Sequence, residues 1–226
     1  MSMQFYVAPE QMMKDRADFA RKGIARGRAL VALCYADGVA LVAENPSNTL
    51  RKISEIYDRI AFAGVGKYNE FDQLRVAGVR AADLKGFQYS RDDVDARSLA
   101  NNYAQILGQI FTHEVKPMEI EILVAEVGTT GDGDQLFHIM FDGTVVDERR
   151  FRVLGGDAEA VTARLSETYS DGMPLDVALR TAVAALCGPE RTLAADDLEI
   201  AVLSRSNGRR CFRRLTDAIV AAALAG

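Results

Sequence analysis

The chain has 226 residues, of which 49% are hydrophobic and 26% charged, with a formal net charge of −5. These proportions are ordinary for a globular protein with a sizeable core, and the acidic balance argues against a nucleic-acid-binding partner, since such proteins present a basic surface. No apolar run is long enough to cross a bilayer, so we expect no membrane partner. Three scattered cysteines and two histidines form no metal-ligand or disulfide spacing. We therefore expect no metal, no cofactor and a cytoplasmic location.

The first predicted element is a helix over residues 9–27. Pro9 suits a first helical position. Four apolar residues then recur at helical spacing: Met13, Ala17, Ala20 and Ile24. The apolar stripe is thin and the other faces are charged, so the helix has a face free for neighbours. A membrane-surface helix is the competing interpretation, which interspersed acidic residues disfavour.

Strands and paired helices alternate along the rest of the chain. The predicted elements are a hairpin at 29–43, two short strands in 52–66, helices at 67–84 and 92–115, strands at 119–128, 135–143 and 145–156, two helices between 157 and 186, and a final hairpin across 198–216. Gly78 lies on the apolar face of its helix and would let another helix approach closely. Asn207-Gly208 predicts a type I′ turn. The alanine-rich residues 217–226 remain as a tail.

The order of these elements predicts the fold class. Strand runs joined as hairpins indicate antiparallel sheets rather than βαβ crossovers. Two helical pairs with enough strands for two sheets indicate an α+β fold, a four-layer αββα sandwich with an extra N-terminal helix. The chain has no repeat or linker, so we predict a single domain over 1–226, with 28–216 as the sandwich.

Several segments contain residue types found in catalytic or ligand-binding sites but lack the rest of the pattern that such a site needs. Residues 63–68 contain Gly-Lys but lack the first glycine and the Ser/Thr of a phosphate loop. The glycine-rich stretch 128–134 is predicted to be a turn. Packing or exposure explains His113 and His138 without catalysis. The basic stretch 207–214 is predicted to be an edge or surface strand.

One run of sequence carries a resemblance. "GVALVAENPSNTLRKISEIYDRIAFAGVGKYNEFDQL" (38–74) has a strand ending in Glu44, then Lys52, then a strand-to-helix segment. It resembles the proteasome core-particle family of N-terminal-nucleophile hydrolases. Residues 155–186 resemble that family's third and fourth helices, and the helix at 9–27 resembles the extra helix of alpha subunits of the actinobacterial type. The resemblance covers nearly the whole chain.

The resemblance also identifies the position where catalysis would occur. In catalytic beta subunits a cut after glycine frees a threonine whose own amine is the base, assisted by groups at the positions of Glu44 and Lys52. Here Gly27 is followed by Arg28. A guanidinium is permanently protonated and can neither attack a carbonyl nor act as a base. The Gly-Thr junctions, at 128–129 and 143–144, lie in mid-fold. We therefore predict a chain that is not itself an enzyme.

The resemblance implies a non-catalytic alpha-ring subunit of a proteasome core particle. It would form a homo-heptameric ring, stack on beta subunits that carry the threonine nucleophiles, and gate the entry of unfolded protein substrates. Residues 1–8 would be the gating segment, in which Phe5 and Tyr6 pack against each other before Pro9. Lys52 would line a pocket between adjacent subunits that receives the C-terminal carboxylate of a ring-shaped ATPase.

The sequence departs from archaeal and eukaryotic alpha subunits because it lacks their Tyr-Asp-Arg opening, so their open-gate contacts are not carried over. Two other functions remain as alternatives. One is an active N-terminal-nucleophile hydrolase after processing. The other is a free-standing binding protein of the same fold.

Overall fold

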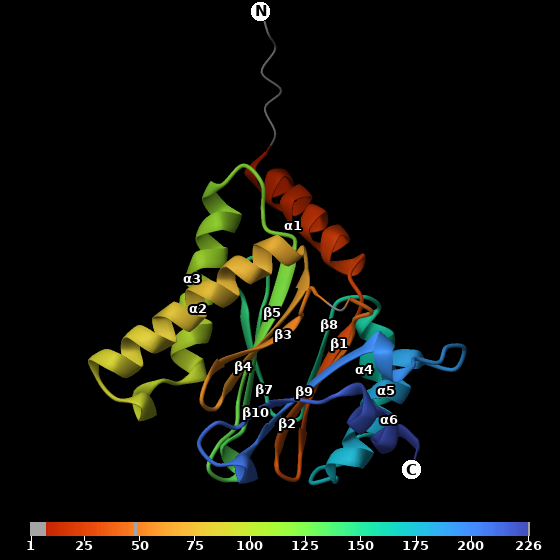
Figure 1. Cartoon of the computed structure of the whole chain (residues 1–226). Helices are drawn as coiled ribbons and strands as arrows, with labels where there is room; N and C mark the ends of the chain where they lie inside the picture. The colour runs from red at the N-terminus through yellow and green to blue at the C-terminus, as the bar shows by residue number, and fades with distance from the viewer. Residues whose placement is uncertain (1–7, 48, 226) are drawn as a thin grey trace, which may run out of the picture.

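The computed structural model describes residues 8–47 and 49–225, which fold into two antiparallel sheets with helices outside them (Figure 1). One five-stranded sheet has the order β10-β9-β2-β1-β8, and the other has the order β3-β4-β5-β6-β7. The strands are β1 (Leu30–Tyr35), β2 (Gly38–Glu44), β3 (Ile53–Tyr57), β4 (Ile60–Gly66), β5 (Ile120–Glu126), β6 (Gln135–Ile139), β7 (Val145–Glu148), β8 (Phe151–Leu154), β9 (Leu198–Ser204) and β10 (Phe212–Arg214). The α-helices are α1 (Pro9–Ala25), α2 (Tyr68–Gln88), α3 (Ala96–His113), α4 (Ala158–Thr168), α5 (Leu175–Cys187) and α6 (Asp217–Ala225).

The layers follow from the alternation of side chains along the strands. In β1, Val31 and Leu33 face a core shared with α4, α5 and α6. Leu30 and Ala32 face the opposite way, into a core between the two sheets. A third core lies between the second sheet and helices α2 and α3. Successive strand residues point to opposite faces, so each sheet contacts one core on each side. The three cores therefore separate four layers, which are helices, sheet, sheet and helices. The predicted αββα sandwich is confirmed.

Helix α1 lies across one end of the sandwich and packs on β4 and β5 (Figure 1). Its apolar stripe is as thin as predicted, since only Ala20 and Ile24 are buried. Met13, expected in the stripe, is 38% exposed, and Met12 and Phe19 are 48% and 47% exposed. The helix therefore presents large apolar side chains that the described part of the chain does not cover.

The segment 145–156 differs from the single strand predicted for it. It forms β7 in one sheet and β8 in the other, with Arg149 and Arg150 at the change of direction. The backbone N–H of Cys34 donates to the carbonyl of Arg150 at 2.8 Å, which ties this crossing to the end of β1. Hydrophobic alternation shows which residues of a strand share a face, but not which sheet the strand belongs to. The passage of the chain from one sheet to the other is therefore not visible in the sequence pattern of 145–156.

The last hairpin has a longer connection than predicted. A type I′ turn needs positive φ at both central residues. Gly208 has a φ of 79°, but the φ of Asn207 is not positive, so the prediction of a type I′ turn is wrong. Instead the chain forms a 3₁₀ turn over Arg205–Asn207. The carboxylate of Asp37 accepts hydrogen bonds from the hydroxyl and backbone N–H of Ser206, which stabilises this longer loop.

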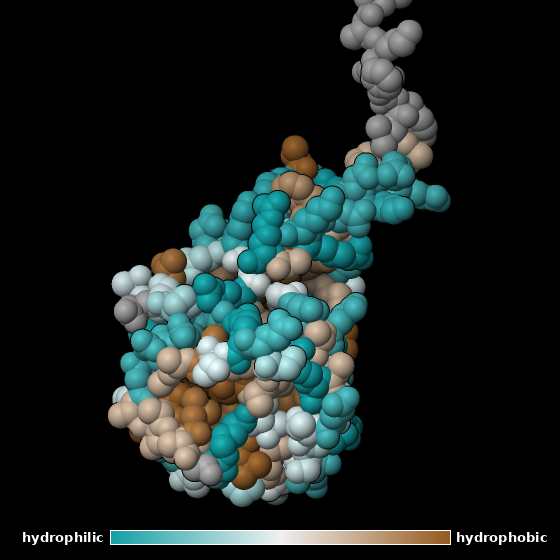
Figure 2. Space-filling model, turned by 90° about the vertical axis from the view of Figure 1, so that its right-hand side faces the viewer, coloured by the Kyte–Doolittle hydropathy of each residue, from teal (hydrophilic) through white to brown (hydrophobic). Residues whose placement is uncertain are grey.

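The C-terminal residues assigned only to a tail form helix α6. Val220 is buried against the core beneath α5, and Arg180 Nη1 donates to the carbonyl of Ala223 at 2.9 Å. Ile219 on the same helix is 45% exposed. Figure 2 shows this side of the molecule, where hydrophobic residues gather in the lower part of the view. No described helix is both long and apolar enough to cross a membrane.

Candidate functional site

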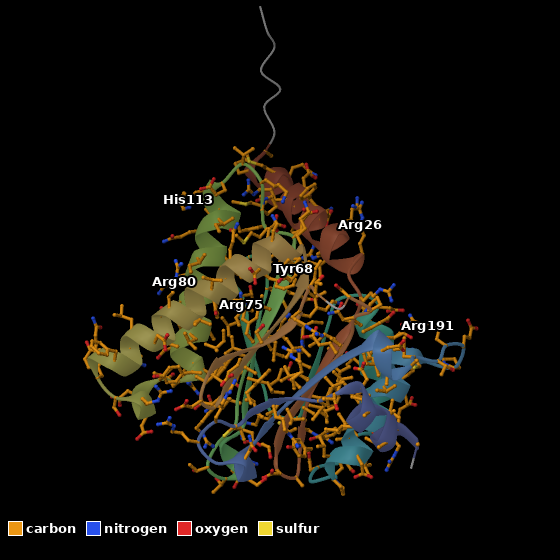
Figure 3. All side chains as sticks on the ribbon, in the orientation of Figure 1. Arg26, Tyr68, Arg75, Arg80, His113 and Arg191 are labelled. Atoms are coloured by element: carbon orange, nitrogen blue, oxygen red, sulfur yellow. The ribbon has the colours of Figure 1, made fainter. Side chains whose placement is uncertain are left out.

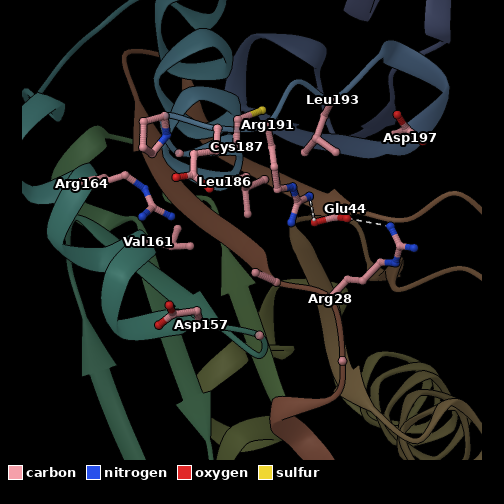
Figure 4. Close-up of a pocket in the computed structure, with 16 residues that line it drawn as sticks. Arg28, Glu44, Asp157, Val161, Arg164, Leu186, Cys187, Arg191, Leu193 and Asp197 are labelled. Atoms are coloured by element: carbon pink, nitrogen blue, oxygen red, sulfur yellow. Dashed lines mark hydrogen bonds and ion pairs between the residues drawn. The ribbon is translucent and has the colours of Figure 1, made fainter.

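Arg28 and Glu44 meet where β1 begins and β2 ends. Arg28 Nη1 lies 2.6 Å from Glu44 Oε1, and Arg191 Nη2 lies 2.7 Å from Glu44 Oε2 (Figure 4). Glu44 is buried, whereas both arginines are about half exposed. The carboxylate is thus held between two guanidinium groups that come from the start of β1 and the connection after α5.

Lys52 approaches the same place from the start of β3. Its Nζ atom donates to the carbonyl oxygens of Arg28 at 2.8 Å and Glu44 at 3.0 Å. An ammonium group has three donors, and among the described residues these two carbonyls are its hydrogen-bond partners. Burial lowers the pKa of Lys52 to about 8, while the carboxylates of Glu44 and Glu199 oppose that shift. Lys52 is therefore a partly desolvated cation with one N–H available to an anionic ligand.

A buried acid that the sequence analysis did not identify lies behind Lys52. Glu199 of β9 is 2% exposed, and it forms an ion pair with Arg214. Its carboxylate also accepts from the backbone N–H of Lys52 at 2.8 Å and from Asn45 Nδ2 at 2.7 Å. The available signal was one acid among the apolar residues of the strand "LEIAVLS", because a buried charge must be paired.

A hollow of about 870 Å³ opens beside the Arg28–Glu44 pair (Figure 4). Charged side chains line much of it, among them Asp157, Arg164 and Arg191. No serine or threonine occurs among its described lining residues. The hollow therefore offers no hydroxyl nucleophile at the position where the resemblance places bond cleavage.

The other predicted site residues belong to the N-terminal region. Phe5 and Tyr6 lie outside the described residues. Pro9 is the first residue of α1, at the far end of that helix from Arg28. The two Gly-Thr junctions, 128–129 and 143–144, lie between strands of the second sheet.

The histidines occupy structural positions. His138 of β6 is buried, and its Nε2 lies 2.8 Å from Glu121 Oε2. His113 is the last residue of α3 and is exposed, on the opposite side of the molecule from Arg191 (Figure 3). Within 8–47 and 49–225, no group of three or more His, Cys, Asp or Glu residues could hold a metal ion.

The glycine-rich segments and the basic stretch form internal contacts. Lys67, after the glycines of β4, is ion-paired with Glu119. Asp134, in the turn 128–134, pairs with Arg205 at 3.0 Å. Arginines around the edge strand β10 pair with acidic residues. For example, Arg210 Nη2 lies 2.6 Å from Oε2 of Glu55 in β3. These pairs explain the segments without phosphate or nucleic acid.

Comparison with known proteins identifies the family of this chain. The family model described as "Proteasome subunit" matches residues 24–203. A protein named proteasome subunit alpha from Acidimicrobium ferrooxidans is 64% identical over 95% of this chain and 93% of its own length. A protein of the same name from Kineococcus radiotolerans is 56% identical over 100% of this chain and 99% of its own length. Another from Frankia alni is 54% identical over 100% of this chain and 98% of its own length. This chain therefore belongs to the proteasome subunit family, in its alpha-subunit branch.

Proposed function

We propose that this chain, a non-catalytic alpha subunit, forms a homo-heptameric ring on proteasome beta subunits, gates substrate entry and docks a ring-shaped ATPase. The single observation that carries the proposal is the grouping of Arg28, Glu44 and Lys52. An arginine paired with a buried carboxylate supports a non-catalytic role for residue 28, and a lysine ammonium held by two carbonyls supports the binding of an anionic group.

The absence of catalysis follows from the chemistry of residue 28. An N-terminal nucleophile needs a hydroxyl beside a free amine, which acts as its base. In this chain the backbone runs from α1 through Gly27, whose N–H donates to Ile24 at 2.9 Å, into Arg28. Residue 28 thus has an amide nitrogen and a permanently charged side chain. Hydrolysis is assigned to threonines of the partner beta subunits.

Assembly into a ring is supported by α1. Its exposed Met12, Met13 and Phe19 would be covered by a neighbouring copy of the chain. Large exposed apolar side chains at one end of a fold are typical of a protein-protein contact, and closed rings are built from such repeated contacts.

Lys52 supports docking of an ATPase through its C-terminus. A compact ammonium in a partly dry site can bind the terminal carboxylate of an entering segment. Two of its donors are held by backbone carbonyls, so the direction of the third is fixed. This rigidity lowers the entropy lost on binding.

Gating is assigned to residues 1–8, with Phe5 and Tyr6 as the side chains that close the entrance. Pro9 is the first residue of α1, a helix that lies at one end of the described fold (Figure 1), so a segment preceding α1 would begin there. The substrates that would pass are unfolded protein chains.

The docking function is tested by Lys52→Ala in the assembled core particle. We expect the variant to lose ATPase-stimulated protein degradation while it keeps assembly and basal peptide hydrolysis. Lys85→Ala is the matched control, because Lys85 is also a half-buried lysine in a polar contact, here with Asp95 at 2.8 Å. Full stimulation of the Lys52 variant would overturn the proposal.

A further inference from the structure

We propose that Glu199 is a positioning residue of the Lys52 docking site, which it builds by fixing the main chain of Lys52 to the opposite sheet. The inference rests on the proposed docking function of Lys52. Glu199 does not touch the incoming carboxylate, and it acts through the lysine that does.

The geometry joins the two sheets at one carboxylate. Glu199 belongs to β9 in the first sheet, whereas Lys52 immediately precedes β3 in the second. One oxygen of Glu199 accepts from the N–H of Lys52 at 2.8 Å and from Asn45 Nδ2 at 2.7 Å. The other accepts from the N–H of Ile53 at 3.2 Å and from Arg214. Four donors on a buried carboxylate fix its orientation, because each bond would cost free energy if left unmade.

The same carboxylate sets the shape of the connection between β2 and β3. Asn45, which donates to Glu199, also donates to the carbonyl of Leu50 at 2.8 Å, and its side-chain oxygen accepts from the N–H of Ser47 at 3.2 Å. Asn45 directly follows Glu44, whose carbonyl holds the lysine ammonium. Glu199 thus controls both the main chain of Lys52 and the residue next to one of its two ammonium acceptors.

The effect of Glu199 on Lys52 can be measured through the pKa of Lys52. The groups that face its ammonium are Arg28 from the start of β1, Glu44 from β2 and Glu199 from β9, and Arg214 from β10 is paired with Glu199. Burial lowers the pKa of Lys52, and the two carboxylates raise it. Removal of the Glu199 charge should therefore lower the pKa of Lys52 further, an effect that a purely structural role of Glu199 elsewhere in the fold would not produce.

The experiment uses the core particle assembled with beta subunits. The probes are a short peptide with a free C-terminal carboxylate and the same peptide with a C-terminal amide, whose dissociation constants are measured across pH. In the unmodified particle the carboxylate peptide should bind more tightly, and this preference should disappear as pH rises through about 8, the pKa of Lys52. Glu199→Gln should weaken carboxylate binding about tenfold, as for one charge-assisted hydrogen bond, and move the midpoint to lower pH.

Two further variants complete the test. Glu55→Gln removes a carboxylate that also joins the two sheets, through Arg210 at 2.6 Å, but does not contact Lys52, so binding should be unchanged. Arg214→Gln keeps the bonds from Lys52 and Asn45 to Glu199 but removes the neutralising guanidinium, so the midpoint should move to higher pH. This variant decides the question if Glu199→Gln fails to assemble.

The outcomes separate the two proposals. If the unmodified particle shows no preference for the carboxylate peptide, docking at Lys52 is wrong. If that preference exists but neither variant moves the pH midpoint, Glu199 does not position the lysine and this inference is overturned.

Discussion

Arg28 donates to Glu44 at 2.6 Å from one side while Arg191 donates to the same carboxylate at 2.7 Å from the other. Glu44 is buried at the end of β2, so its charge is compensated by these two direct ion pairs, with a further electrostatic contribution from Lys52. The ion pairs connect the start of β1, the end of β2 and the connection after α5. Arg28, which the family resemblance assigns to the nucleophile's position, therefore has a structural partner of its own.

This relationship predicts a non-additive effect on stability. Arg28→Ala or Arg191→Ala alone should lower the free energy of unfolding by less than about 1 kcal/mol, because the remaining half-exposed arginine still pairs with Glu44. The double variant removes both direct ion-pair partners of a buried carboxylate and should lose about 3 kcal/mol. Chemical unfolding of the four proteins measures this cycle. Additive losses would contradict the shared role.

The lowered pKa of Lys52 predicts a pH dependence of folding. An unfolded lysine titrates near 10.5, whereas the folded one titrates near 8. Between these values the unfolded chain binds more protons, so unfolding becomes less favourable as pH rises. In Lys52→Met this contribution is absent.

We therefore expect the stability of the unmodified chain, relative to Lys52→Met, to rise between pH 8 and 10.5. Thermal melts at several pH values measure the difference. Lys85→Met is the control, because the ion pair of Lys85 with Asp95 is partly exposed. A difference that is independent of pH would show that the ammonium is well solvated.

The proposed gate predicts faster entry when residues 2–8 are deleted. The assembled particle should then hydrolyse short peptides more rapidly, because the obstruction before Pro9 has been removed while α1 remains intact. A Phe5→Ala, Tyr6→Ala double variant should give part of the same acceleration. Rates of fluorogenic peptide cleavage measure both. Equal rates in the deleted and full-length particles would remove the gating role.

The layers could be predicted from sequence because they depend on local alternation. Along β1 every second residue faces the helices. The short connections between neighbouring strand segments predicted hairpins, and hairpin strands such as β1 and β2 pair antiparallel. The division of 145–156 between two sheets depends instead on where the chain turns at Arg149-Arg150, which period-two hydrophobicity does not encode.

The candidate site was predicted only in part, for a similar reason. Arg28, Glu44 and Lys52 were identified through the family resemblance, and the structure brings them together. Their roles stay predictions. Glu199 was not identified, because its partners are 147 and 154 residues away and only the folded sandwich brings them within hydrogen-bonding distance.

Gly78 provides the last prediction. The sequence analysis expected it to admit a neighbouring helix, and in the structure Tyr103 of α3 occupies that space. A Cβ atom at position 78 would lie 1.7 Å from the Tyr103 hydroxyl oxygen, so Gly78→Ala must displace the ring. We expect a loss of about 2 kcal/mol in the free energy of unfolding, typical of overpacking.

Gly108→Ala is the matched control in α3, because its Cβ would lie 3.6 Å from the nearest atom considered, an ordinary contact. Its helix propensity should raise stability by about 1 kcal/mol or less. Tyr103→Phe should restore part of the Gly78→Ala loss, because it removes the clashing hydroxyl, which has no hydrogen-bond partner among the described residues. Chemical unfolding compares the variants. If Gly78→Ala were as stable as Gly108→Ala, the close approach of α2 and α3 would be refuted.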